Sequence, residues 1–264
     1  VPGNSGIPAA IRDLVIVVPF NDPEAVARAL AEHRGQVAAM ILEPVMMNAG
    51  IIPPDDGYLA AIRDMLHAEG ALLIFDEVKT GFTTGPGGAT AITGVVPDMI
   101  CLAKALGGGI AVAAIGGTTE VMSLIADGRY EQVGTFNGNP LAMAATRATL
   151  SEVLTPAAYE RMTRLAARLR DSLDATIAQY GYGWHVVSVG SKGCVTFKRE
   201  PVREFRDFLT IDDRLGHLHW LMQHNGGVFL PPWGKVEQWL LSVQHDEDDV
   251  DRFARNFARL AEAV

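Results

Sequence analysis

The chain has 264 residues, of which 48% are hydrophobic and 20% are charged. This composition is typical of a folded globular protein, so we exclude the disordered, collagen-like and low-complexity classes. Asp and Glu outnumber Lys and Arg by 31 to 22, which gives a net charge of −9. Because an acidic surface repels phosphate backbones and anionic lipids, we expect neither a nucleic acid nor a membrane as a partner.

The two cysteines, Cys101 and Cys194, are too few for a disulfide framework and lack the CxxC spacing of a metal or redox site. They favour a reducing compartment, and we expect a cytoplasmic protein. The chain opens with Val1-Pro2-Gly3-Asn4 rather than with a methionine. We therefore expect that an upstream part is missing.

In the first half of the chain, short apolar runs alternate with segments of helical spacing. The predicted strands are 15–18, 37–42, 71–75, 99–102 and 111–115, and the predicted helices are 25–33 and 56–69. This alternation predicts a largely parallel sheet covered by helices on both faces.

After residue 138 the pattern changes to long helical periodicity, followed by a mixture of short strands and helices. The predicted helices are 141–154, 157–180, 211–224 and 246–263, and the predicted strands are 186–189, 194–197, 227–230 and 239–243. We expect a large α/β domain over 1–153 and a smaller α+β domain over 154–264.

A buried strand ends in Asp76 and Glu77, so it delivers a carboxylate where open α/β sheets bind ligands. A capping aspartate or the Walker B strand of a nucleotide hydrolase would also fit this pattern. The GxxxxGK[ST] phosphate loop of such a hydrolase is not present in these 264 residues.

A second apolar strand is followed by Lys104 and then by three glycines, Gly107, Gly108 and Gly109. A lysine in apolar, glycine-rich surroundings loses hydration, which makes its amine a better nucleophile. A lysine that simply extends into solvent is the plainer interpretation. Together, Asp76 and Lys104 are what pyridoxal phosphate needs, because the lysine forms a Schiff base and the carboxylate keeps the pyridine nitrogen protonated.

A third motif, Gly134-Thr135-Phe136-Asn137-Gly138-Asn139-Pro140, leads into a predicted helix. Backbone amides and a hydroxyl before a helix N-terminus can bind a phosphate group. An ordinary turn before an Asn-Pro helix start is the alternative.

With these motifs in order, the chain resembles the class III, pyridoxal-phosphate-dependent aminotransferases, and most closely their glutamate-1-semialdehyde aminomutase-like branch. The matching segments are Leu42-Glu43-Pro44-Val45, Leu73-Ile74-Phe75-Asp76-Glu77-Val78, Thr80-Gly81-Phe82, Gly94-Val95-Val96-Pro97-Asp98, Lys104-Ala105-Leu106-Gly107-Gly108-Gly109, Gly134-Thr135-Phe136-Asn137-Gly138-Asn139-Pro140 and Ser242-Val243-Gln244-His245. The resemblance implies the fold of type I pyridoxal-phosphate enzymes, with the upstream part of the large domain missing.

The resemblance also implies roles for individual residues. Lys104 would be the Schiff-base lysine, Asp76 the partner of the pyridine nitrogen, and Val78 a contact to one face of the ring. Gly134 and Thr135 would contact the cofactor phosphate of the neighbouring subunit, which implies a homodimer with a shared phosphate site. Glu43 and Glu237 would lie on the substrate side.

The implied reaction is amino-group transfer between an amino acid or amine and a keto acid or aldehyde. An intramolecular aminomutase of the glutamate-1-semialdehyde type and a non-catalytic fragment with an incomplete cofactor site remain alternatives. Lys79 stands where the branch usually has an uncharged residue, Thr83 where it often has arginine, and the family arginine for a second carboxylate is not evident near Leu241. Substrate choice therefore stays open.

No metal site is expected. The histidines at 217, 219 and 224 lack carboxylates in register, so they more simply belong to a helix face. Trp233 and Trp239 flank Glu237 and would either line the substrate entrance or pack in the smaller domain, with packing the preferred interpretation.

Overall fold

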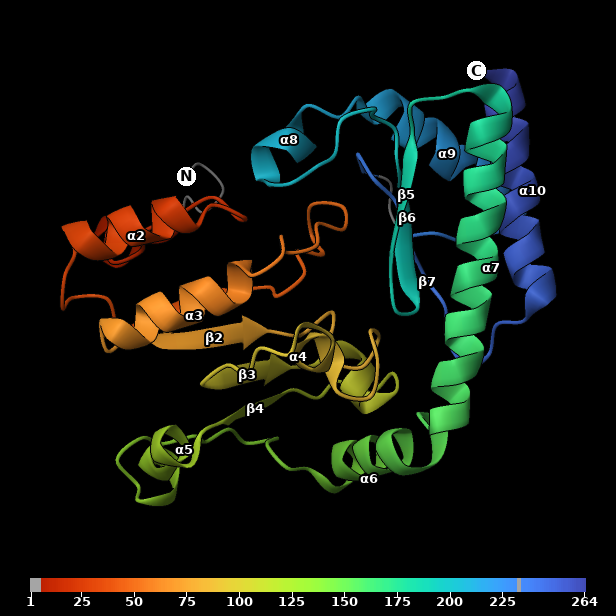
Figure 1. The fold of residues 1–264 in the computed structure, drawn as a ribbon. Helices are drawn as coiled ribbons and strands as arrows, with labels where there is room; N and C mark the ends of the chain where they lie inside the picture. Colours follow the sequence, from red (N-terminus) through yellow and green to blue (C-terminus); the bar gives the residue numbers. More distant parts are fainter. Residues whose placement is uncertain (1–5, 232–233) are drawn as a thin grey trace.

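The computed structural model describes residues 6–231 and 234–264 and shows two β-sheets, each with its own helices (Figure 1). The first sheet has the order β1-β2-β3-β4 and the second the order β5-β6-β7. The strands are β1 (Ala39–Leu42), β2 (Leu72–Asp76), β3 (Met99–Leu102), β4 (Ala114–Gly117), β5 (His185–Val189), β6 (Lys192–Thr196) and β7 (Gln238–Leu240).

Ten α-helices are described around the two sheets. They are α1 (Ala9–Arg12), α2 (Pro23–Glu32), α3 (Tyr58–Ala68), α4 (Gly88–Thr93), α5 (Thr119–Ala126), α6 (Pro140–Ala148), α7 (Pro156–Tyr180), α8 (Phe205–Leu209), α9 (Asp213–Asn225) and α10 (Glu247–Ala263). Helices α1, α4, α5 and α8 were not predicted, because four to eight residues are too few to show a helical period.

Strands β1, β2 and β3 are parallel and β4 is antiparallel to β3, which confirms the prediction of a largely parallel α/β sheet. Helices α2 and α3 cover the face that carries Leu73 and Phe75, and both of these side chains are fully buried. On the other face Ile41 and Ile115 are 62% and 38% exposed. The predicted helical cover is therefore incomplete on this second face over the described ranges.

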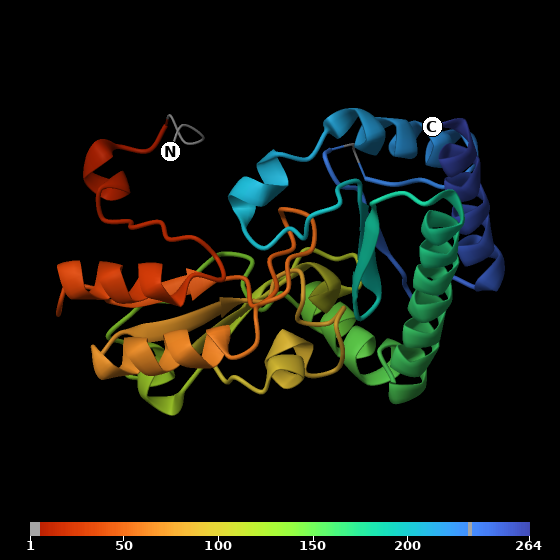
Figure 2. The same cartoon turned by 45° about the horizontal axis from the view of Figure 1, so that its top comes forward.

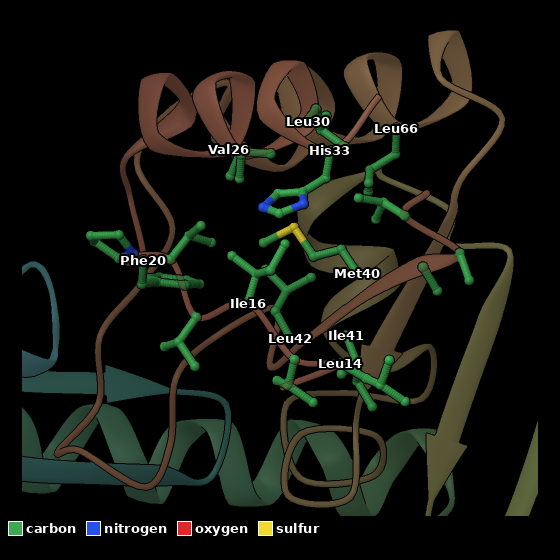
Figure 3. Close-up of a pocket in the computed structure, with 18 of the residues that line it drawn as sticks. Leu14, Ile16, Phe20, Val26, Leu30, His33, Met40, Ile41, Leu42 and Leu66 are labelled. Carbon is green, nitrogen blue, oxygen red and sulfur yellow. The ribbon is translucent and has the colours of Figure 1, made fainter. Parts of the chain in front are cut away.

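Residues 15–18 do not form the predicted strand. An apolar cavity of about 830 Å³ lies between this segment and β1, with α2 above it (Figure 3). Leu14, Ile16 and Met40 are among the residues around it. The segment is a short apolar run, as in a strand, but among the described residues β1 at the edge of the sheet pairs only with β2.

The connection between the two sheets runs through α6, a π-helical turn (Thr149–Val153) and the 25-residue helix α7. Asn139 begins α6: its side chain accepts a hydrogen bond of 2.9 Å from the Ala142 amide, and Pro140 fills the first helical position. The predicted helix 141–154 is thus an α-helix that ends in a π turn, and helix 157–180 is confirmed.

The second sheet packs against α7 and α10 through an apolar core that includes Leu169, Val195, Trp239 and Phe257. The predicted strand at 227–230 is wrong. Its Val228 amide donates to the Gln223 carbonyl oxygen at 2.8 Å, so this segment closes the end of α9 instead of joining a ladder.

The opposite face of this second sheet contacts the loops that follow the strands of the first sheet. Cys194 from β6 packs in a buried cluster with Val45, Met47 and Ala89. In Figure 2 the second sheet stands beside the ends of the first. None of the described helices is long and apolar enough to cross a lipid bilayer.

Candidate functional site

Three predicted site residues follow the carboxyl ends of neighbouring parallel strands. Glu43 comes directly after β1, Asp76 is the last residue of β2, and Lys104 comes two residues after β3. The register places Leu42 beside Phe75 and Asp76 beside Cys101. The structure therefore places all three at the sheet edge where α/β folds bind ligands.

Asp76 is half-buried, and its Oδ1 accepts a hydrogen bond of 3.0 Å from the amide of Val78. No Lys, Arg or His of the described chain lies within ion-pair distance of its carboxylate. Burial first, and the charge of Asp76 second, raise the pKa of the Cys101 thiol on the adjacent strand. A half-buried carboxylate without an ion pair, such as that of Asp76, can accept a hydrogen bond from a protonated ring nitrogen.

Lys104 has a backbone φ of +50°, and Asn21 is the one other described non-glycine residue with a positive φ. A bulky residue in this region stores about 1–3 kcal/mol of strain, and such strain clusters at functional sites. Gly108 follows with a φ of +57°, and a Cβ there would lie 2.4 Å from Thr149 Oγ1. The glycine triplet thus lets the chain turn tightly behind Lys104.

Lys104 is exposed in the single chain, so the expected loss of hydration is not observed there. Val78 is half-buried and contacts Asp76 through its amide. Its contact with a cofactor ring stays a prediction.

Glu77 has a structural role that the sequence did not reveal. Its carboxylate is 1% exposed and accepts hydrogen bonds from the Ala89 amide at 2.6 Å, the Thr90 amide at 2.8 Å and the hydroxyls of Thr80 and Thr90. It therefore holds the first turn of α4 beside the end of β2. A single sequence gives no signal for contacts 12 and 13 residues away.

Glu43 accepts hydrogen bonds from the Met47 amide at 2.9 Å and from the Asn48 side chain at 3.0 Å. Both carboxylate oxygens of Glu43 thus stabilise the loop that follows β1. Gln238 at the start of β7 donates to the carbonyl oxygens of Met47 and Gly50 in this same loop.

Glu237 lies just before β7 and is 4% exposed. Burial raises the pKa of its carboxyl to about 7, against the opposing effect of a hydrogen bond from the Gly234 amide. No hydrogen bond or ion pair of the described residues joins Glu237 to Asp76 or Lys104. Its role on the substrate side stays a prediction.

Gly134 and Thr135 are exposed in the turn before α6. Within the part of the chain that the structure describes, no hydrogen bond links them to Asp76 or Lys104. Their role in binding a phosphate stays a prediction.

Two lysines of the site were not selected from the sequence as site residues. Lys192 on β6 is 6% exposed, and its Nζ donates a hydrogen bond of 3.0 Å to the carbonyl oxygen of Lys79, in the turn after β2. The Lys79 Nζ in turn donates to the Met47 carbonyl oxygen at 3.3 Å. Lys192 lies outside the strand predicted at 194–197, so the sequence contained no signal for it.

Trp239 and His219, two further candidates from the sequence, lie in the second core. Trp239 is 3% exposed and packs there, as preferred, whereas Trp233 lies outside the described residues. His219 is buried, and burial lowers its pKa to about 4. Over 6–231 and 234–264, no group of three His, Cys, Asp or Glu side chains could hold a metal ion.

Comparison with known proteins identifies the family to which the chain belongs. The family model described as "Aminotransferase class-III" matches residues 7–237. A glutamate-1-semialdehyde 2,1-aminomutase from Thermomicrobium roseum is 42% identical over 253 residues, which cover 95% of this chain and 58% of that protein. The chain thus spans less than two thirds of the length of this curated relative.

Solved structures agree with this result. An omega-transaminase from Sphaerobacter thermophilus superposes with a TM-score of 0.91 at 30% identity, covering 99% of this chain and 60% of the other. A glutamate-1-semialdehyde aminomutase from Pseudomonas aeruginosa, in complex with PMP, gives 0.86 at 29% identity, covering 97% and 59%. The chain belongs to the class III aminotransferase family, in its glutamate-1-semialdehyde aminomutase-like branch.

Proposed function

We propose that this chain is part of a pyridoxal-phosphate-dependent enzyme that transfers an amino group between an amino acid or amine and a keto acid or aldehyde. The observation that carries the proposal is the position of Asp76 and Lys104, which end neighbouring parallel strands in a chain of the class III family. Relatives of the same fold have been solved with PMP and with PLP bound.

The residues present fit this cofactor at its ring. Asp76 offers a carboxylate that no described cation neutralises, which suits a protonated pyridine nitrogen. Lys104 offers an exposed primary amine on a strained, glycine-supported turn. Gly134 and Thr135 would hold the phosphate group ahead of α6, whose N-terminus favours anions.

When bound, the cofactor supplies an aldehyde that takes up amino groups and a ring that accepts electrons. Lys104 would bind it covalently and, once a substrate amine replaces Lys104, would move a proton to and from the reacting substrate carbon. Asp76 would hold the proton on the ring nitrogen, and Val78 would fix the plane of the ring.

An aminomutase is the second candidate, and the 42% identity with a glutamate-1-semialdehyde 2,1-aminomutase favours it. Both reactions need the same roles for Asp76 and Lys104. They differ in whether the amino group leaves with a keto product or returns to a neighbouring carbon of one molecule.

We also propose a homodimer that shares the phosphate site, in the cytoplasm. The segment around Gly134 and Thr135 exposes Val133, Phe136 and Leu141, whose side chains are 78%, 80% and 67% exposed. An apolar surface of this kind supports an interface at this place. Two free cysteines support a reducing compartment.

The test is borohydride reduction of the chain supplied with pyridoxal phosphate, followed by intact mass and peptide mapping. We expect one pyridoxyl adduct, on the Lys104 peptide, and none in Lys104→Met. Absence of the adduct from the unmodified chain would favour a non-catalytic fragment instead. Gel filtration with light scattering tests the dimer.

A further inference from the structure

Three lysines gather around the loop after β1 and the turn after β2. Lys192 reaches the Lys79 carbonyl oxygen, and Lys79 reaches the Met47 carbonyl oxygen. The positive charge of Lys104 helps to lower the pKa of both Lys79 and Lys192, so the three ammonium groups lie within electrostatic reach of one another. Glu43 acts on the same two lysines in the opposite direction.

The direction of Lys192 follows from the register of the second sheet. Lys192 and Cys194 are two residues apart on β6, so their side chains lie on the same face. Cys194 packs against Met47 and Val45 from the loop after β1. Lys192 therefore extends from the second sheet toward the strand ends that carry Glu43, Asp76 and Lys104.

These lysines lack sufficient negative charge nearby. Neither Lys79 nor Lys192 forms an ion pair within 4 Å among the described residues, so Glu43 acts on both from a greater distance. Each ammonium group donates one hydrogen bond that the structure records, which leaves donors available. A buried cation without a counter-ion is costly, and an anion bound here would remove part of that cost.

Burial is the main cause that lowers the pKa of Lys192, to about 8, and that of Lys79 also falls because of burial. At neutral pH Lys192 is therefore mostly charged. In the loaded enzyme Lys104 is bound to the cofactor, so Lys79 and Lys192 are the two lysines of this group left to bind an anion.

We propose that Lys79 and Lys192 form a subsite beside Lys104 that binds the carboxylate of an amino-acid substrate. The inference rests on the proposed function and narrows it from amines in general to substrates that carry a carboxylate.

Binding of butanoate to the pyridoxal-phosphate-loaded chain tests the subsite without requiring turnover. Butanamide serves as its uncharged analogue and inorganic phosphate as the competing anion. The variants are Lys192→Met and Lys79→Met. Lys198→Met is the matched control, because Lys198 follows the same strand but its Nζ donates to Thr210, away from the site.

We expect calorimetry to show butanoate binding at least about tenfold weaker in each site variant than in the unmodified chain or in Lys198→Met, because hydrogen bonds to charged groups contribute about 1.5–3 kcal/mol. The affinity for butanamide should be the same in the variants and in the unmodified chain. Equal butanoate affinity in the unmodified chain and in both variants would overturn the proposal. The proposal would also be wrong if the variants lost phosphate binding but kept butanoate binding.

Two measurements separate this inference from the proposed function. Thermal unfolding identifies a variant that fails to fold. If one lysine variant fails to fold, butanoate binding to the other lysine variant tests the subsite. The borohydride adduct on Lys104 should form in both variants. If the adduct forms but butanoate affinity is unchanged, the subsite is wrong and the cofactor assignment stands. If the adduct is absent from the unmodified chain, the proposed function fails first.

Discussion

Ser191 donates two hydrogen bonds to the carbonyl oxygen of Thr83, from its amide at 2.9 Å and from its hydroxyl at 3.0 Å. Ser191 belongs to the turn between β5 and β6, and Thr83 belongs to the segment after β2. This contact fixes the second sheet against the loops of the first, which is what brings Lys192 to Lys79.

The neighbouring Gly190 makes this contact possible, and Gly190→Ala should disrupt it. Gly190 has a φ of +58°, and a Cβ there would lie 2.3 Å from the Thr83 oxygen and 2.4 Å from Thr84 Cα. Urea unfolding should show a loss of about 1–2 kcal/mol from the left-handed backbone and about 1–3 kcal/mol more from the clash.

Gly181→Ala is the matched control, because Gly181 has a φ of +68° with nothing within 4 Å of the added methyl group. It should show the backbone cost alone. Equal losses for the two variants would mean that the turn between β5 and β6 is not pressed against Thr83 and Thr84 in solution.

Asp76→Asn tests the proposed ring partner. Asparagine can still accept the Val78 amide hydrogen bond, so we expect little change in stability. It carries no negative charge, and loss of such a preorganised electrostatic interaction should lower the transamination rate by at least about 100-fold. Asp64→Asn, on the exposed surface of α3, should leave the rate unchanged. A fully active Asp76→Asn enzyme would contradict the assignment.

Glu77→Ala should destabilise the chain, because it removes the acceptor of two backbone amides, those of Ala89 and Thr90. Unsatisfied buried donors cost about 1–3 kcal/mol each, so we expect a loss of about 3 kcal/mol or more. Glu131→Ala, at an exposed position, should change stability by less than about 0.5 kcal/mol. Similar unfolding midpoints for the two variants would show that Glu77 does not hold α4.

The elements that could be predicted from sequence are those determined by local pattern. Strand β3 has the predicted bounds, and helices α2, α3, α7 and α10 fall within a few residues of prediction, because caps and apolar spacing mark them. The segment 15–18 is a short apolar run typical of a strand but has no paired neighbour among the described residues, and pairing is not encoded in one segment.

The site divides in the same way. Asp76 and Lys104 could be predicted because each follows an apolar strand, and parallel strands bring their ends together. The roles of Glu77 and Lys192 could not be predicted, because they depend on contacts to residues 12 to 113 positions away. Burial of Lys104 was expected from its neighbours in sequence, yet the side chain is exposed.

Glu237 predicts a specific pH dependence of stability. Its folded-state pKa of about 7 lies above the ordinary value of 4.5, so the folded chain binds more protons than the unfolded chain between these values. The contribution of this group is therefore complete below about pH 4.5 and is lost as the pH rises through about 7. The upper limit of the change is about 3 kcal/mol, from the difference between the two pKa values.

Glu237→Gln removes this titration while keeping an oxygen that can accept the Gly234 amide. Urea unfolding at pH 5, 6, 7 and 8 should therefore show the variant gaining stability relative to the unmodified chain as the pH rises. Glu262→Gln, at an exposed position near the end of α10, should follow the unmodified chain throughout. Parallel pH profiles for the unmodified chain and Glu237→Gln would show that Glu237 is solvated in the folded chain. A solvated carboxylate at this position could contact a substrate.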